Sequence, residues 1–571
     1  MLRLTTLVSA LLLGGCVTAP AQPPTGTAAF DWFEYEGADP LPSGVKEMPG
    51  TYRNPILGGF YPDPSVTRVA DDYYLVNSTF SYFPGIPVFH SRDLVNWTQI
   101  GNAIDRPDQL DFKQLGLSRG VFAPTIEHNR GTFYILNTCV DCGGNFLITA
   151  TNPAGPWSDP VWLPELEGGI DPSLFFDDDG GAWIVNNGPP VGKPLYEGHR
   201  AIWIQRYDPA MKRTMGSRTV LVNGGVDIAT KPVWIEGPHI FKKDGFYYLT
   251  AAEGGTAEGH SQVVLRSRTV TGPYTPNPAN PILTQRDLPR DRPMPITSAG
   301  HADFVETQAG EWWATFLAVR PYRADFYNTG RETFLMPVKW ENGWPRITAP
   351  GEALPYVHSK PKLAAQPSPA LRHNGNFTAR DEFDDQALPL NWMMMRNPRE
   401  RWWSLAGGAL RVQGRDVPLG ASANPSFLGR RQQHMHASAS TAVRFRPERE
   451  QDQAGIVALQ SDEYWYLLAV ARHGGRQVLQ LRRRAGPGEP EVGIVLASAP
   501  LDVTSGAPVY LRIDARGGEY DFHYATREGA WVAFRRGVDG TILSTRTAGG
   551  FVGSMFGVHV YTAEPVVLTG E

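Results

Sequence analysis

The sequence lacks any run of like charges. Its 53 lysines and arginines are scattered among 58 acidic residues, which leaves a formal net charge of -5 over 571 residues. Proteins that follow a phosphate backbone gather their basic side chains into patches or stripes. Nucleic acid is therefore excluded as an expected partner.

Long apolar runs are also missing, apart from a short one at the N-terminus. That run ends at Leu13, so it is too short to span a bilayer but has the length of a signal-peptide core. No other stretch approaches the roughly 18 apolar residues of a membrane helix. We therefore expect an exported protein whose only membrane attachment is a lipid anchor.

The N-terminal run ends in LLGGC at residues 12–16, which resembles a bacterial lipobox. Lipidation would make Cys16 the mature N-terminus. We therefore assign residues 1–22 to a lipoprotein signal peptide and anchor, and place the protein in the periplasm or at the outer membrane. The alternative is ordinary cleavage between residues 19 and 22, with Cys16 lost.

Cysteine is scarce, with three residues in the whole chain. Cys139 and Cys142 form a lone C-x-x-C, and because no second pair exists, the sequence does not supply the ligands of a structural zinc site. In an oxidising compartment we favour a local disulfide or two packed thiols over a redox centre.

Aromatic residues, glycine and proline are abundant. The chain holds 16 Trp, 21 Tyr and 26 Phe together with 60 Gly and 49 Pro. This composition is typical of many short strands joined by tight turns, so the predicted fold class is all-β. The length exceeds one ordinary core, which predicts two domains in addition to the export segment.

One pattern occurs five times: a turn, paired aromatic residues and an apolar strand. The copies are DYYL at 72–75, TFYI at 132–135, AWIV at 182–185, FYYL at 246–249 and EWWA at 311–314. Their spacings of 49 to 65 residues suit a four-stranded propeller blade with loops. We predict a five-bladed β-propeller over residues 51–350; the alternative is a β-sandwich with coincidental aromatic strands.

The regions outside the repeats predict linkers and a second domain. Residues 351–376 are rich in proline and alanine without periodicity, which indicates a linker, and we assign residues 23–50 to an N-terminal linker. Alternating apolar segments within residues 377–571 predict a C-terminal β-sandwich.

Three carboxylates stand in unusual local settings. Asp63 is flanked by two prolines, Asp171 opens an Asp-Pro-Ser that enters an apolar strand, and Glu236 lies inside a largely apolar segment, where burial would raise its pKa. Hydrolysis of an acetal needs one acid and a second carboxylate. An isolated Asp-Pro-Ser more often marks a turn, but three such carboxylates across one repeat architecture favour catalysis.

Several segments, in order along the chain, resemble glycoside hydrolase family 43. They are NPILGGFYPDPS at 54–65, STF at 78–80, FPG at 83–85, HSRDLVNW at 90–97, EGPH at 236–239, AEGGT at 252–256, GHA at 300–302 and GRET at 330–333. The resemblance implies a five-bladed propeller of inverting enzymes, many of which are β-xylosidases or α-L-arabinofuranosidases.

Catalytic roles follow from the matching motifs. The resemblance implies that Asp63 is the general base, Glu236 the general acid, and Asp171 the residue that orients the acid and tunes its pKa. It implies that Arg331 binds sugar hydroxyl groups.

The same resemblance places Phe80, Phe122 and Thr256 around the terminal sugar. Phe122 stands where many xylosidases carry a tryptophan, a departure that bears on which sugar is bound. His301 matches a histidine near the propeller axis, beside a structural calcium or a water; the alternative is a hydrogen-bonded core histidine. No cofactor is required by this assignment.

The region from residue 377 resembles the concanavalin-like sandwich that closes the pocket of xylosidase-like relatives. A closed pocket admits only a chain end. We therefore expect an exo-acting enzyme that releases α-L-arabinofuranose, β-D-xylose or both from oligosaccharides of hemicellulose (xylan, arabinoxylan and xyloglucan). Two alternatives remain at this point: a non-catalytic glycan-binding propeller lipoprotein, and an enzyme that cleaves inside arabinan chains.

Overall fold

The computed structural model describes residues 26–504 and 506–563, so Cys16 and the predicted signal peptide lie outside the described residues. The described chain is built almost wholly of strands, with one short α-helix, α1 (Thr545–Ala548), and three 3-10 turns at Pro164–Leu166, Ile228–Thr230 and Gly540–Leu543. None of the helices in these two ranges is long and apolar enough to cross a membrane. The predicted all-β fold class is confirmed.

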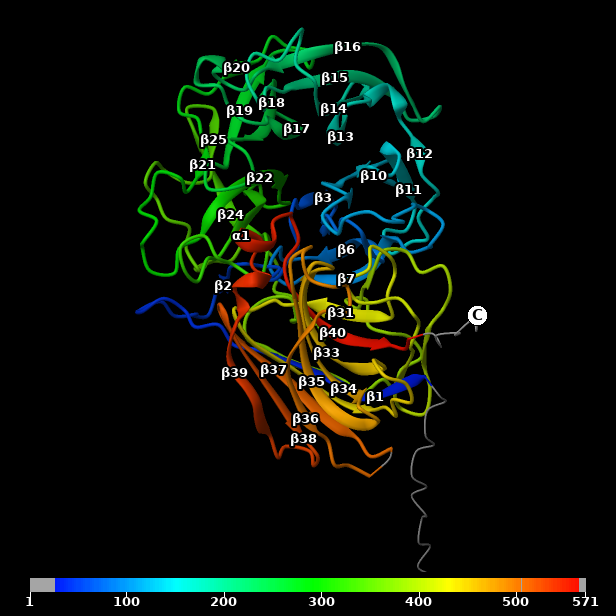
Figure 1. The fold of residues 1–571 in the computed structure, drawn as a ribbon. Helices are drawn as coiled ribbons and strands as arrows, with labels where there is room; N and C mark the ends of the chain where they lie inside the picture. Colours follow the sequence, from blue (N-terminus) through cyan, green and yellow to red (C-terminus); the bar gives the residue numbers. More distant parts are fainter. Residues whose placement is uncertain (1–25, 505, 564–571) are drawn as a thin grey trace, which may run out of the picture.

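Five sheets of four or five antiparallel strands make up the propeller (Figure 1). The first blade contains β3 (Ser65–Val69), β4 (Asp72–Val76), β6 (Gly85–Ser91) and β7 (Thr98–Ile104). The second blade contains β9 (Thr125–Asn129), β10 (Thr132–Val140), β11 (Gly144–Ala150) and β12 (Val161–Trp162), and β8 (Gly120–Val121) also pairs with β10.

The third blade contains β13 (Ile170–Phe176), β14 (Ala182–Gly188), β15 (Ala201–Asp208) and β16 (Arg213–Asn223). The fourth contains β17 (Glu236–Lys243), β18 (Phe246–Glu253), β19 (Ser261–Ser267) and β20 (Thr275–Pro276), and β21 (Leu283–Thr284) also pairs with β19. The fifth contains β22 (Thr297–Glu306), β23 (Trp312–Val319), β24 (Glu332–Glu341) and β25 (Trp344–Arg346). The first strand of each blade contacts the first strand of the next, and β22 contacts β3, so the five inner strands form a closed ring.

The five aromatic repeats occupy equivalent places in the five blades. Their anchor residues all lie on the second strand of a blade, namely Tyr74, Tyr134, Trp183, Tyr248 and Trp313. The aromatic pairs seal neighbouring blades: Tyr74 meets Phe133 at 4.9 Å between ring centres, and Tyr134 meets Phe176 at 5.2 Å. Such pairs add about 0.5–1.5 kcal/mol each beyond the burial of their surface. The predicted five-bladed propeller is confirmed.

A two-stranded sheet joins the two ends of the propeller. It pairs β2 (Thr51–Arg53) with β26 (Val357–Ser359). The segment predicted as a linker over residues 351–376 therefore contains one strand. The sequence did not reveal it because β26 has only three residues and finds its partner about 300 positions earlier in the chain.

The C-terminal domain is a sandwich of two sheets. One contains β29 (Trp403–Leu405), β30 (Leu410–Gln413), β1 (Thr27–Gly37), β32 (His436–Arg444), β37 (Val509–Arg516), β38 (Glu519–Ala525) and β39 (Val532–Asp539), with β27 (Phe377–Asp381) also on β1; the other contains β31 (Phe427–Arg431), β40 (Met555–Tyr561), β33 (Gln453–Ser461), β34 (Tyr464–His473), β35 (Arg476–Ala485) and β36 (Ile494–Pro500).

Strand β1 corrects the prediction of an N-terminal linker over residues 23–50. It lies inside the sandwich, paired with β32 on one side and with β27 and β30 on the other, and Figure 1 shows it in blue beside the orange strands. Phe30, Phe33 and Tyr35 bury their rings in the sandwich core. Because every pairing partner lies more than 330 residues away, the local sequence carried no sign of this sheet.

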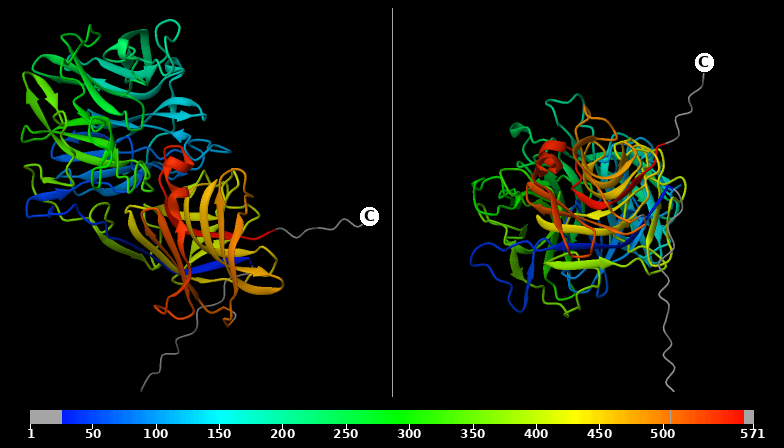
Figure 2. Two further views of the ribbon diagram at one scale, coloured as in Figure 1. Left: turned by 60° about the vertical axis from the view of Figure 1, so that its left-hand side comes forward. Right: turned by 60° about the horizontal axis from the view of Figure 1, so that its bottom comes forward.

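The sandwich packs directly on the first blade of the propeller (Figure 2). A short sheet pairs β5 (Tyr82–Phe83) with β28 (Met394–Met395), and a common hydrophobic core joins Phe60 and Phe80 of the propeller to Phe427 and Trp465 of the sandwich. Burial of large aromatic side chains contributes about 1.5–3 kcal/mol each. The shared core holds one end of the sandwich over the loops that precede the inner strands.

Candidate active site

The three carboxylates singled out in the sequence meet at one end of the inner strands. Asp63 lies two residues before β3, Asp171 is the second residue of β13, and Glu236 is the first residue of β17. All three line one pocket, together with His301 of β22. The pocket, together with its open mouth, holds about 350 Å³ of space free of protein atoms.

The backbone at the three carboxylates departs from regular strand geometry. Asp63 and Asp171 have φ angles of 52° and 53°, in the left-handed region. Asp enters this region more readily than most residues, and such conformations gather at functional sites. The pairing register shifts between Ile170 and Ser173, around Asp171, and between Glu236 and His239, as in a β-bulge, which re-aims a side chain at the end of a strand.

Asp63 is held as a carboxylate by two hydrogen bonds. Ser78 Oγ donates to Oδ2 at 2.5 Å, and Arg331 Nη1 donates to Oδ1 at 3.2 Å. Burial alone would raise the pKa of Asp63, but the positive charge of Arg331 and the hydrogen bond from Ser78 outweigh it, and the pKa lies below the ordinary value. Asp63 is therefore ionised at neutral pH.

Glu236 is held in the opposite protonation state. Its side chain is buried, and burial raises its pKa well above the ordinary value. The negative charges of Asp171 and Asp63 push the pKa further up, while Arg331 and Arg200 oppose the shift. Glu236 therefore keeps its proton to a higher pH than Asp63, which lines the same pocket.

Asp171, the third carboxylate of the pocket, interacts with the surroundings of both of these groups. Burial, followed by the charge of Asp63, raises its pKa to about 7. Its Oδ2 accepts a hydrogen bond at 3.2 Å from the backbone N–H of Gly237, the residue that follows Glu236. This contact fixes the start of β17 against the start of β13, and so fixes the direction in which Glu236 leaves the backbone.

The residues predicted to surround the sugar also line this pocket: Phe80, Phe122, Thr256 and Arg331. The sequence did not predict one wall of the pocket, which the sandwich domain contributes. The ring of Phe551 stacks on Phe80 with 6.0 Å between centres and an interplanar angle of 21°, and it meets Phe122 edge-on at 5.7 Å. Ala123 and Ile170 complete the lining.

Phe551 had no recognisable signal in the sequence. It follows Gly549 and Gly550 in a turn after α1, about 220 residues beyond Arg331, whose guanidinium lies 5.2 Å from its ring centre. Only the resemblance to enzymes with a closing sandwich indicated that this domain would reach the pocket.

His301 lies beside Asp63 and is neutral. Its Nδ1 is 3.8 Å from Asp63 Oδ1, and burial lowers its pKa to about 4. Within residues 26–504 and 506–563, no group of three or more His, Cys, Asp or Glu side chains is arranged to hold a metal ion. Calcium prefers six to eight oxygen ligands, whereas Asp63 is already held by Arg331 and Ser78. The structural calcium beside His301 stays a prediction.

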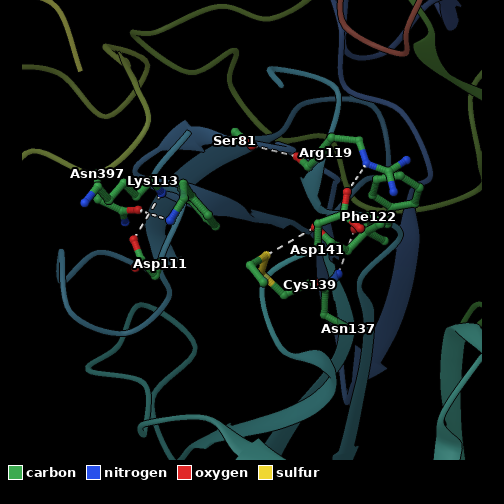
Figure 3. Close-up of a disulfide and its surroundings, with 12 residues drawn as sticks. Ser81, Asp111, Lys113, Arg119, Phe122, Asn137, Cys139, Asp141 and Asn397 are labelled. Carbon is green, nitrogen blue, oxygen red and sulfur yellow. Dashed lines mark hydrogen bonds and ion pairs between the residues drawn. A yellow bond between two sulfur atoms is a disulfide. The ribbon is translucent and has the colours of Figure 1, made fainter. Parts of the chain in front are cut away.

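Cys139 and Cys142 form a disulfide at the end of β10, close to the pocket (Figure 3). The turn that it closes carries Asp141, whose carboxylate accepts a hydrogen bond from Arg119 Nε at 2.6 Å. The guanidinium of Arg119 lies 5.7 Å from the ring centre of Phe122. The disulfide therefore braces a turn that contacts the pocket wall through Arg119.

Both domains of the chain match known families. Residues 52–345 match the model of glycosyl hydrolases family 43, and residues 380–566 match the beta xylosidase C-terminal concanavalin A-like domain. A xylosidase/arabinosidase of Butyrivibrio fibrisolvens is 37% identical over 511 residues, which cover 89% of this chain and 95% of that protein.

Two further proteins extend the similarity. A non-reducing end alpha-L-arabinofuranosidase of Bacteroides ovatus is 36% identical, over 89% of this chain and 91% of that protein. The crystal structure of a GH43 protein retrieved from a capybara gut metagenome is 40% identical, with a TM-score of 0.86, over 94% of this chain and 99% of that one. The chain therefore belongs to glycosyl hydrolase family 43 and is a glycoside hydrolase.

Proposed function

We propose that the protein is an exo-acting, inverting glycoside hydrolase that releases single terminal pentoses, α-L-arabinofuranose, β-D-xylose or both, from hemicellulose oligosaccharides. The observation that carries the proposal is one small pocket in which the pKa of Asp63 is lowered and the pKa of Glu236 is raised. Two carboxyl groups with pKa values pushed apart are the requirement for acid and base acting together.

The reaction follows from these protonation states. Asp63 accepts a proton from a water molecule while the water oxygen attacks the anomeric carbon. Glu236 donates its proton to the glycosidic oxygen, and the bond between that oxygen and the anomeric carbon breaks. The new hydroxyl group arrives on the face opposite to the leaving group, which inverts the anomeric configuration. Exchange of protons with solvent then restores both carboxyl groups.

Exo action is supported by the aromatic wall that the sandwich adds to the pocket. Phe551 of the sandwich lies against Phe80 and Phe122 of the propeller, so aromatic rings from both domains meet over the sugar site. Cleavage inside a chain needs a groove that is open on both sides of the catalytic residues. The names of the Butyrivibrio and Bacteroides relatives support the choice of arabinofuranose and xylose.

The preferred sugar depends on Phe122. A pocket lined by Phe80, Phe122 and Phe551 should exclude the hydroxymethyl group of a hexopyranose by steric clash. An apolar pocket separates two such similar pentoses only modestly, so activity on both is expected. Because Phe122 is smaller than an indole, we propose a preference for α-L-arabinofuranosides, as in the trimming of xylan or xyloglucan branches.

Export as a lipoprotein anchored through Cys16 remains part of the proposal. It is supported by the LLGGC motif at residues 12–16, which lies outside the described residues.

A panel of nitrophenyl glycosides tests the proposed activity. We expect turnover of the α-L-arabinofuranoside and the β-D-xyloside, little turnover of the β-D-glucoside, and loss of activity in Asp63→Asn. A preference for the glucoside, or full activity in Asp63→Asn, would contradict the proposal.

A further inference from the structure

A second, larger hollow adjoins the catalytic pocket. It contains about 1420 Å³ of space free of protein atoms, against about 350 Å³ for the pocket by the same measure. We call it the Trp234 groove, and define it by Trp234, Arg200, Gly169, Asp141 and Cys139. Phe122, Glu236 and Phe551 are among the residues that line both spaces.

The position of Glu236 indicates which part of a substrate would lie in the groove. Glu236 lines both the pocket and the groove, whereas Asp63 and Asp171 line the pocket alone. An acid that protonates the departing oxygen must stand between the sugar that is released and the group that leaves. A third hollow, beside Asp325 and Arg546, also adjoins the pocket, but Glu236 does not line it. Glu236 therefore stands between the pocket and the Trp234 groove.

Trp234 presents an aromatic surface in this groove. It is 39% exposed and lies two residues before Glu236, with a φ of 48°. Few bulky residues adopt this left-handed conformation, and here a hydrogen bond from its backbone N–H to the carbonyl of Gly198 at 2.9 Å holds it. Strain of this kind persists where the surrounding structure enforces it, which is common at binding sites.

Arg200 fixes the indole ring. Its guanidinium lies 4.9 Å from the ring centre of Trp234 and is itself bound to Asn187 Oδ1 and to the carbonyl of Gly168. A ring that is already held loses little conformational entropy when a ligand stacks on it. Indole rings are large, rigid surfaces with one apolar face on each side, and the C–H face of a sugar ring is a suitable partner.

The disulfide turn forms another wall of the groove. Cys139, Val140, Asp141 and Gly144 line it, and Figure 3 shows Asp141 directed toward Arg119 beside Phe122. Because the Cys139–Cys142 bond closes this turn, the wall is braced covalently. Carboxylate, guanidinium and backbone groups along this side supply partners for sugar hydroxyl groups.

We propose that the Trp234 groove binds the leaving group of a glycan substrate, and that the first sugar unit after the scissile bond stacks on Trp234. The assignment rests on the proposed glycosidase function and extends it: the favoured substrates are oligosaccharides with at least one further sugar unit, and Trp234 determines that preference.

Two pairs of substrates test this assignment. In each pair the released sugar is the same, but one substrate carries a sugar leaving group and the other a single fluorine atom that reaches none of the groove. The pairs are xylotriose with β-D-xylopyranosyl fluoride, and arabinofuranosyl-xylotriose with α-L-arabinofuranosyl fluoride. In Trp234→Ala, we expect kcat/KM for the oligosaccharide to fall about tenfold further than kcat/KM for the matching fluoride. Trp234→Phe, which keeps an aromatic ring, should recover most of that difference.

Trp162→Ala is the matched control. Trp162 is 41% exposed, close to the exposure of Trp234, but it is not among the residues that line the groove. We expect it to change the ratio between oligosaccharide and fluoride by less than twofold. An equal effect of Trp234→Ala on both members of a pair, or no effect on either, would overturn the assignment and leave the glycosidase function standing. A wild-type protein that releases no pentose from any of the four substrates would instead contradict the function itself.

Discussion

Arg331 donates a hydrogen bond to Asp63 over 3.2 Å inside the pocket, and no other Arg or Lys makes an ion pair with this carboxylate among residues 26–504 and 506–563. Both side chains are buried, with 8% and 6% of their surface exposed. In such a buried environment, where the dielectric constant is low, a charge-assisted hydrogen bond is stronger than at the protein surface. Arg331 therefore helps to hold the pKa of Asp63 below its ordinary value.

Replacing Arg331 with Gln should shift the pH dependence of the reaction. Because Arg331 lowers the pKa of Asp63, its loss raises that pKa, so the acidic limb of kcat/KM moves to higher pH. Loss of a hydrogen bond to a charged group should also reduce kcat/KM by about ten- to a hundredfold. The measurement is a pH profile on a nitrophenyl pentoside.

Ser78→Ala is the control for this experiment. It removes the other hydrogen bond to Asp63 without removing a charge, so the acidic limb should move in the same direction by less. An acidic limb that stays in place in Arg331→Gln would show that Arg331 does not set the pKa of the base.

Glu236→Gln should reduce activity on substrates with poor leaving groups far more than activity on substrates with activated leaving groups. A sugar leaving group needs a proton, whereas a nitrophenolate does not, and general acid catalysis contributes about 10²–10⁴-fold. We expect losses in that range on oligosaccharides and much smaller losses on aryl glycosides. Glu253→Gln is a matched control, since Glu253 is also buried and also has a raised pKa, but does not line the pocket. Near-normal activity of Glu236→Gln on oligosaccharides would remove it from the mechanism.

The sequence predicted those parts of the molecule whose signals are local. The five aromatic repeats and the settings of Asp63, Asp171 and Glu236 are each contained in a few consecutive residues, and the structure brings these carboxylates together. Strand β1 and Phe551 depend on partners hundreds of residues away. Tertiary pairing of that kind leaves no periodicity in a short window, which is why a linker was predicted where β1 lies.

Phe122→Trp should change which pentose is preferred. A wider indole in contact with Phe80 and Phe551 reduces the room for an arabinofuranose side group, and differences between such similar sugars amount to about 1–3 kcal/mol. We expect the ratio of kcat/KM for the xyloside to that for the arabinofuranoside to rise several-fold. An unchanged ratio would show that Phe122 does not set the preference.

Cys16→Ser should detach the protein from the membrane or block its processing. One acyl chain binds a bilayer only marginally, but the several chains of a bacterial lipoprotein hold firmly. Val17 follows Cys16 in place of an aspartate, so by the common sorting tendency the wild-type protein should fractionate with the outer membrane. Wild-type protein found wholly in the soluble fraction would contradict the lipid anchor.

The central claim is that Asp63 and Glu236 act as an inverting pair, and the stereochemistry of the first product tests it most directly. Proton NMR should be recorded in the first minutes of hydrolysis of a nitrophenyl β-D-xyloside, before the released sugar mutarotates. The account predicts that α-xylose appears first and β-xylose only later, because water attacks from the face opposite to the leaving group. Initial appearance of β-xylose would mean a covalent intermediate and would contradict the roles assigned to both carboxyl groups.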